Sequence, residues 1–163
     1  VTLVDTGEST MTGGRIKRII NSGYIKWETF FMTYGDGLSD VNLDKLLKTH
    51  FESNRLATLT AVQPESRFGK LEIFNGEVIS FWEKKDTIWQ YINWGFMVLN
   101  KKISSYIDWD ESIFEKNPLE NLAKDWSLWA YHHNGFWFAM DTLHHKQQLE
   151  NMWAMWKPPW RLF

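Results

Sequence analysis

A single carboxylate between two glycines is the first feature of the sequence that could do chemistry. Asp36 lies in the Thr-Tyr-Gly-Asp-Gly segment at 33–37, after a run at 28–34 whose aromatic and Thr content is typical of a β-strand. The glycines let the backbone turn at the carboxyl end of that strand, where α/β sheets bind ligands. An exposed carboxylate there suits Mg²⁺, which takes oxygen ligands and leaves room for phosphates. Gly-Asp-Gly is also ordinary turn chemistry, so the motif alone leaves a plain turn open.

A second carboxylate, Asp141, stands at a comparable position near the end of the sequence. It follows an apolar run at 136–140 and precedes a helix whose apolar stripe ends before Pro158. The sharper interpretation is that Asp36 and Asp141, far apart in the sequence, meet across one metal ion. The alternative is that Asp141 caps the amino terminus of that helix, which contributes about 0.5–2 kcal/mol to stability.

Four histidines near the second carboxylate suggest a zinc site as a further alternative: His132, His133, His144 and His145. Neighbouring histidines on one strand point to opposite faces, so at most one of each pair could easily bind a metal. The sequence has no cysteine and no His-Glu-x-x-His helix to support such a site. We therefore expect surface or packed histidines.

The residues that follow Asp36 predict a βαβ unit. Segment 42–50 has apolar residues at i, i+3, i+4 and i+7, as in an amphipathic helix, and Asn42 is a plausible N-cap. The run at 56–62 is continuously apolar and β-branched, which is typical of a strand buried on both faces. With the strand at 28–34, this order predicts a strand, a helix and a strand in one sheet.

The remaining segments complete an α/β pattern. Asn75-Gly76 separates two alternating runs, 70–74 and 78–82, and predicts a hairpin. A first helix is expected at 15–21, with Gly23 at its carboxyl end, and another opens with Asn117 as its cap. Further strands are predicted at 1–4, 92–99, 127–132 and 136–140. We therefore expect a single α/β domain over residues 1–163, with a mostly parallel sheet.

Composition narrows the functional classes. The sequence has 163 residues, and its 18 Lys and Arg balance 20 Asp and Glu, which argues against a general nucleic-acid binder. No apolar run approaches the roughly 18 residues of a membrane span, so no membrane partner is expected. The lack of cysteine fits a cytoplasmic location. The 11 Trp residues could stack on sugars or bases, but filling a core or an interface is the expected role.

Several short motifs together resemble the glucose-1-phosphate cytidylyltransferases, a branch of the sugar-nucleotide pyrophosphorylases. The motifs occur in the family's order and cover essentially the whole sequence. They are Leu3-Val-Asp-Thr-Gly, Thr10-Met-Thr-Gly-Gly-Arg15, Thr33-Tyr-Gly-Asp-Gly37, Thr60-Ala-Val-Gln-Pro64, Arg67-Phe-Gly69, Phe81-Trp-Glu-Lys84, Ile92-Asn-Trp-Gly-Phe96 and Gly135-Phe-Trp-Phe-Ala-Met-Asp-Thr-Leu143. The second and the last of these favour the cytidylyl branch.

The resemblance implies a reaction and a fold. CTP and α-D-glucose 1-phosphate would give CDP-glucose and pyrophosphate, and the product would serve dideoxy-sugar synthesis for O-antigen lipopolysaccharide. The fold would be the three-layer α/β sandwich of the nucleotide-diphospho-sugar transferases. The sugar-phosphate oxygen would attack the α-phosphorus of CTP in line with the departing pyrophosphate, a reaction that depends mostly on positioning and charge stabilisation.

The resemblance also implies roles for individual residues. Asp36 and Asp141 match the aspartates that hold Mg²⁺, and Lys84 would hold the attacking phosphate. Glu83, beside Lys84, would bind the sugar. Four further positions match substrate contacts, at the sugar pocket or at the loop near the nucleotide. The sugar-pocket positions are Gly69 and Asn93, and the loop near the nucleotide contains Gly13 and Gly14.

Two features depart from the family pattern. The strand and Gly-rich loop that grip the triphosphate in the family have no counterpart in these residues, so the sequence corresponds to the family's carboxyl-terminal part. We therefore expect the isolated chain to have little or no cytidylyltransferase activity. An unpaired sheet edge would also favour a homo-oligomer. Trp94 stands where the family has a small residue, so it would either intrude on the sugar or turn into the core.

Two alternatives remain open at this point. The chain could come from another sugar-phosphate nucleotidylyltransferase that uses UTP or dTTP. From a different class, it could be a catalytically dead sugar-binding or oligomerisation module, whose binding would be indifferent to Mg²⁺.

Overall fold

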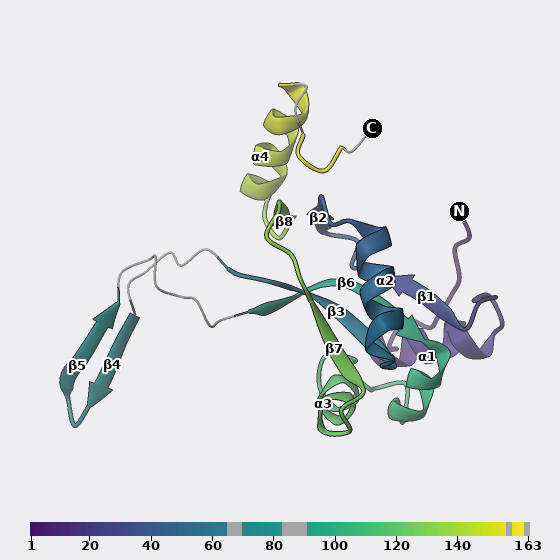
Figure 1. Ribbon diagram of the computed structural model, residues 1–163. Coiled ribbons are helices and arrows are strands. Elements are labelled where there is room, and N and C mark those ends of the chain that lie inside the picture. Colours follow the sequence, from purple (N-terminus) through teal and green to yellow (C-terminus); the bar gives the residue numbers. More distant parts are fainter. Residues whose placement is uncertain (65–69, 83–90, 156–157, 162–163) are drawn as a thin grey trace.

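A mixed four-stranded sheet lies at the centre of the computed structural model, which describes residues 1–64, 70–82, 91–155 and 158–161. The strand order is β1-β6-β3-β7, where the strands are β1 (Thr29–Met32), β3 (Ala57–Val62), β6 (Ile92–Asn100) and β7 (Leu128–His132). β3 pairs with β7 in parallel, whereas β6 is antiparallel to both of its neighbours (Figure 1).

The prediction of a mostly parallel sheet therefore needs correction at β6. β1, β3 and β7 run in the same direction, and the predicted βαβ order of β1, α2 and β3 is confirmed, with β6 inserted between the two strands. The described part of the connection from β3 to β6 contains a hairpin and no crossover helix. Without such a helix, the chain returns to the sheet in the opposite direction.

Helices cover both faces of the sheet and give the expected three layers. α2 (Leu43–Ser53) packs over β3, β6 and β7 on one face. On the other face lie α1 (Thr12–Asn21), α3 (Asn117–Lys124) and a 3₁₀ helix, Lys101–Tyr106. The core on this second face contains fully buried side chains such as Phe114, Leu99 and Leu122.

Local signals explain most of the helix ends. The Asn42 side chain accepts a hydrogen bond from the Lys45 backbone N–H at 2.8 Å, which confirms the predicted N-cap of α2. Gly23 follows α1 with a φ of +74°, as expected for a helix-ending glycine. α3 starts at Asn117 itself, so Asn117 is not the cap, and residues 1–4 form no strand.

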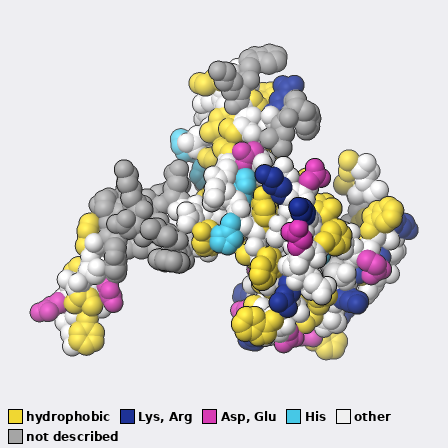
Figure 2. All heavy atoms as spheres, in the orientation of Figure 1, with side chains coloured by type: hydrophobic (Ala, Val, Ile, Leu, Met, Phe, Trp, Pro, Cys, Tyr) yellow, Lys and Arg dark blue, Asp and Glu magenta, His cyan; other side chains and the backbone are white. Residues whose placement is uncertain are grey.

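The Asn75-Gly76 hairpin is confirmed. β4 (Lys70–Phe74) and β5 (Glu77–Trp82) pair antiparallel, and both turn residues have positive φ, 49° and 87°, as a two-residue hairpin turn requires. The hairpin lies apart from the main sheet, with hydrophobic side chains on its surface (Figures 1 and 2). Phe74 and Phe81 are 65% and 59% exposed.

A short second ladder and the last helix lie at one end of the molecule (Figure 1). β2 (Gly37–Ser39) pairs antiparallel with β8 (Trp137–Ala139), and α4 (Leu143–Ala154) follows. Thr142 caps α4 by accepting a hydrogen bond from the His145 N–H at 3.1 Å, so the alternative role of Asp141 as the cap is wrong. Within the described ranges, no helix has the length and apolar character needed to cross a membrane.

Candidate active site

The β2–β8 ladder brings the two predicted carboxylates to one place. Gly37 pairs with Ala139, and the Met140 N–H donates to the Asp36 carbonyl at 2.9 Å, which extends the ladder by one step. Asp36 therefore lies opposite Met140, whose neighbour in the chain is Asp141. Both carboxylates are exposed. Residues 105 positions apart in sequence thus lie at the same end of one pair of strands.

The chemistry of these donors fits Mg²⁺ better than zinc. Mg²⁺ is usually held by one or two carboxylates, with water and substrate phosphates as its other ligands. A structural zinc site needs four side-chain ligands and a catalytic one needs three. Among the described residues, no group of three His, Asp or Glu side chains is placed to hold a metal, so the zinc alternative gains no support. His145 instead accepts a hydrogen bond from the Asp141 N–H through Nδ1, at 3.3 Å.

A cavity of about 570 Å³ opens beside Asp141. Phe136 lines it from just before β8, Phe138 from β8 and Met152 from α4. His145 packs its ring edgewise against Phe138, with 5.4 Å between the ring centroids. Aromatic faces next to a carboxylate can stack on a sugar or a base while the polar groups of the ligand face the ion.

Trp94 turns into the core. Its side chain is only 8% exposed, and its ring centroid lies 4.9 Å from that of Trp137 on β8. It also packs against Gly37 on β2, where a Cβ would lie 3.5 Å from the Trp94 ring. Trp94 is not among the residues that line the cavity beside Asp141. Of the two predicted orientations, the structure therefore has the one that leaves this cavity open.

Asn93 stands at a bulge in β6. The pairing with β3 shifts between Leu59, opposite Met97, and Ala61, opposite Asn93, so β6 carries extra residues at this point. The Asn93 side-chain oxygen accepts the Gly95 N–H at 3.0 Å. Such bulges often redirect a side chain beside a site. The structure places Asn93 next to the Tyr34 side chain, close to the Asp36 turn.

Tyr34 links three of the predicted site segments, a role that sequence reasoning missed. Its ring covers Gly95, which has a φ of +89° and no room for a Cβ. Its hydroxyl donates to the Glu115 carboxylate, which also accepts from the Thr12 hydroxyl at 2.8 Å at the start of α1. The position of Tyr34 directly before the Gly-Asp-Gly turn was the available signal; nothing in the sequence pointed to Glu115.

Burial, and then the Glu115 carboxylate, raise the pKa of the Tyr34 phenol above its ordinary value of 10.0. The unfolded chain therefore loses this proton at a lower pH than the folded chain does, so stability should fall as the pH rises above about 10. Tyr34→Phe should remove this part of the decline and cost about 0.5–1.5 kcal/mol at neutral pH through the lost hydrogen bond. Urea unfolding between pH 8 and 11 measures both effects.

The exposed Tyr24 provides the control for this measurement, because Tyr24→Phe should leave the alkaline decline of the wild-type chain unchanged. An equally steep decline in Tyr34→Phe and wild type would contradict the assignment.

Gly13 and Gly14 serve close packing at the start of α1. Both N–H groups donate to the Ser112 carbonyl, at 2.8 and 3.4 Å. A Cβ on Gly13 would lie 2.7 Å from the same oxygen, and one on Gly14 would lie 2.6 Å from Asp110 Cα. α1 begins at Thr12, three residues before the predicted start. A contact of these glycines with nucleotide stays a prediction.

Three other predicted residues, Gly69, Glu83 and Lys84, lie outside the described part of the chain. Their assignment to the sugar and its phosphate therefore also stays a prediction.

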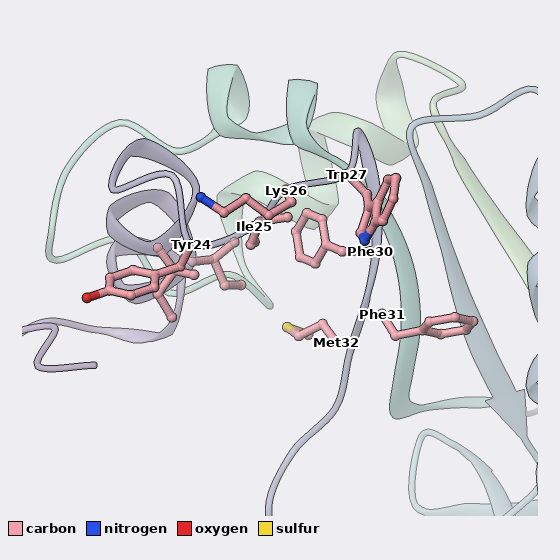
Figure 3. A pocket seen from close by; sticks show the side chains of 9 residues that line it. Tyr24, Ile25, Lys26, Trp27, Phe30, Phe31 and Met32 are labelled. Carbon is pink, nitrogen blue, oxygen red and sulfur yellow. The ribbon is translucent and has the colours of Figure 1, made fainter. Parts of the chain in front are cut away.

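An apolar groove of about 430 Å³ lies beside β1, between this strand, α1 and the segment that joins them. Figure 3 shows Phe30 and Met32 pointing from β1 toward Tyr24, with Phe31 on the opposite side of the strand. Trp27 and Tyr24 are 78% and 54% exposed. One edge of β1 pairs with β6, and within the described residues no strand pairs with the other edge.

Comparison with known proteins supports the resemblance over the whole chain. No family model matches. The glucose-1-phosphate cytidylyltransferase of Salmonella typhimurium is 46% identical over 162 residues, 99% of this chain. The predicted resemblance is confirmed. The probable glucose-1-phosphate cytidylyltransferase of Bacillus subtilis is 39% identical over 100% of the chain. The chain spans 62% and 63% of the length of these two relatives.

Solved structures confirm the fold class. HddC from Yersinia pseudotuberculosis matches 87% of the chain with a TM-score of 0.62 at 22% identity. A putative glucose-1-phosphate thymidylyltransferase from Bacillus anthracis, in complex with a sucrose, matches 90% with a TM-score of 0.64 at 16% identity. The chain covers 62% of each of these proteins. At these identities the likeness establishes the α/β fold that the chain shares with these two proteins.

Proposed function

We propose that this chain forms the metal- and sugar-phosphate-binding part of a glucose-1-phosphate cytidylyltransferase. The reaction is CTP plus α-D-glucose 1-phosphate to CDP-glucose plus pyrophosphate. The observation that supports the proposal is the pairing of β2 with β8, because Asp36 and Asp141 stand at the same end of this ladder in a chain 46% identical to a protein of that name. Synthesis of O-antigen sugars in the cytoplasm is the corresponding biological setting.

In this reaction an oxygen of the sugar phosphate attacks the α-phosphorus of CTP as the bond to pyrophosphate breaks. Asp36 and Asp141 would hold Mg²⁺, which supplies positive charge to the phosphates when bound. Lys84 would hold the phosphate of the sugar, so that two anions can approach each other. The aromatic cavity beside Asp141 would exclude water from one side of the bound substrate.

A titration of nucleotide sugars tests the specificity. We expect the chain to bind CDP-glucose at least about tenfold more tightly than UDP-glucose or dTDP-glucose, a difference of about 1.4 kcal/mol, in buffer with MgCl₂. Preference for UDP-glucose or dTDP-glucose would favour the other nucleotidylyltransferases. Binding of glucose alone, with no contribution from the nucleotide, would favour a sugar-binding module.

We also infer that the 163-residue chain self-associates through the apolar groove and the edge of β1 with which no described strand pairs. An edge strand with unpaired backbone groups is a template for pairing with a second copy, and the exposed Trp27 and Tyr24 extend the apolar surface. Light scattering should give a mass above the monomer that falls for Trp27→Glu. Trp109→Glu, which changes a similarly exposed Trp outside the groove, is the control. A monomeric wild-type chain at all concentrations would refute self-association.

A further inference from the structure

A buried histidine lies against the two strands that carry the metal carboxylates. His133 is 8% exposed and follows β7, and its Nε2 lies 2.9 Å from Oδ1 of Asp40, which follows β2. The same nitrogen lies 3.2 Å from the carbonyl oxygen of Phe136, which precedes β8. Because a carbonyl oxygen can only accept, Nε2 carries the hydrogen in its bond to Phe136. Asp40 Oδ1 lies within ion-pair distance of the same nitrogen, without a hydrogen bond to it.

Neighbouring groups add further contacts between the end of β2 and the residues just before β8. The Ser39 hydroxyl donates to the Phe136 carbonyl at 2.8 Å, and the Asp40 N–H donates to it at 3.2 Å. Gly135 allows the approach, because a Cβ there would overlap the Asp40 carboxylate and lie 2.7 Å from His133 Cε1. The residues between β7 and β8 are thus held against the end of β2 by one cluster of polar contacts.

This cluster does not have the geometry of a nucleophilic triad, although it contains Ser, His and Asp. In a triad the serine and the aspartate contact different ring nitrogens of the histidine. Here Ser39 Oγ, at 3.3 Å, and Asp40 Oδ1 share Nε2, and the hydroxyl already donates to a carbonyl. The cluster therefore connects the end of β2 to the residues between β7 and β8.

The cluster and the two carboxylates lie at opposite ends of the β2–β8 ladder. The β2–β8 ladder is three residue pairs long, from Ser39 opposite Trp137 to Gly37 opposite Ala139. The His133 cluster holds the first end, and Asp36 and Asp141 stand just beyond the second. A two-stranded ladder is marginally stable by itself, so the geometry at its far end depends on what holds the near end.

We propose that His133 is a positioning residue for the metal carboxylates. It acts through Asp40 and the Phe136 carbonyl to hold β2 against β8, which keeps Asp36 and Asp141 facing one ion. This inference rests on the proposed metal site. It assigns no contact between His133 and substrate or metal.

The test measures Mn²⁺ binding to the full 163-residue chain by water-proton relaxation, with Mn²⁺ alone as the probe. His133→Ala should weaken Mn²⁺ binding at least about fivefold, or about 1 kcal/mol. His133→Gln should restore most of it, because its amide N–H can donate to the same acceptors. His132→Ala is the matched control, since His132 is the adjacent histidine but is exposed, and it should bind as the wild type does.

A second variant keeps the test decisive if His133→Ala does not fold. Asp40→Asn keeps the size of the side chain and removes its charge, and it should weaken Mn²⁺ binding in the same direction. Wild-type affinity in His133→Ala or, where that variant is unfolded, in Asp40→Asn would overturn the inference, as would an equal loss in His132→Ala.

The carboxylate variants separate the two proposals. If Asp36→Asn and Asp141→Asn weaken Mn²⁺ binding but His133→Ala does not, only the positioning role fails. If the carboxylate variants bind as the wild type does, or the wild type binds no Mn²⁺, the metal site fails and the role of His133 falls with it.

Discussion

Replacing Asp36 or Asp141 with Asn should abolish the effect of Mg²⁺ on CDP-glucose binding. Each variant keeps the size of the side chain and removes the charge that would hold the ion. Since the two carboxylates stand at the same end of the β2–β8 ladder, either change leaves a single charged ligand. We expect each variant to bind CDP-glucose about tenfold or more weakly than the wild type with MgCl₂, and equally to it with EDTA.

Asp108→Asn is the control for these variants, because Asp108 is also an exposed aspartate but is distant in the fold from the ladder. It should retain the full Mg²⁺ effect. If Asp36→Asn and Asp141→Asn both retained the effect as well, Mg²⁺ would act elsewhere and the metal assignment would be wrong.

Gly14→Ala should strongly destabilise the chain, with no nucleotide present. A Cβ on Gly14 would overlap the Asp110 carbonyl oxygen and lie 2.6 Å from Asp110 Cα, and these backbone atoms cannot move aside as the end of a flexible side chain could. Overpacking of this kind costs about 1–3 kcal/mol, and sometimes more. Urea unfolding monitored by circular dichroism measures the change in the free energy of unfolding.

Gly35→Ala is the matched control for Gly14→Ala. Gly35 lies in open space and has no positive φ, so a methyl group there should change stability by less than about 1 kcal/mol. A Gly14→Ala variant as stable as the wild type would show that the segment at 108–113 can move away from α1. The two glycines of α1 would then be free to approach a ligand after all.

Local signals in the sequence predicted local structure well. The helix cap at Asn42 and the hairpin turn at Asn75-Gly76 depend only on residues close in the chain, and both are confirmed. The placement of Asp36 and Asp141 at the same end of the β2–β8 ladder is long-range, and the family motifs suggested it. The spacing of these two carboxylates in the sequence does not by itself predict that they lie at the same end of a ladder.

Other features depended on contacts that the sequence does not display. The direction of β6 follows from the path of the preceding chain, and the orientation of Trp94 follows from a partner ring on β8. The use of the Gly13 and Gly14 N–H groups depends on Ser112, almost 100 residues away. His133 was expected to be a packed or surface residue, and only its distance to Asp40 shows what it holds together.

The most direct test of the metal site is to titrate the wild-type chain with CDP-glucose in an isothermal calorimeter, once in MgCl₂ and once in EDTA. We predict binding that is at least about tenfold tighter with Mg²⁺, because the ion would join the pyrophosphate of the ligand to Asp36 and Asp141. Equal binding under the two conditions, or binding of free glucose alone, would contradict it and favour a sugar-binding module without nucleotide chemistry.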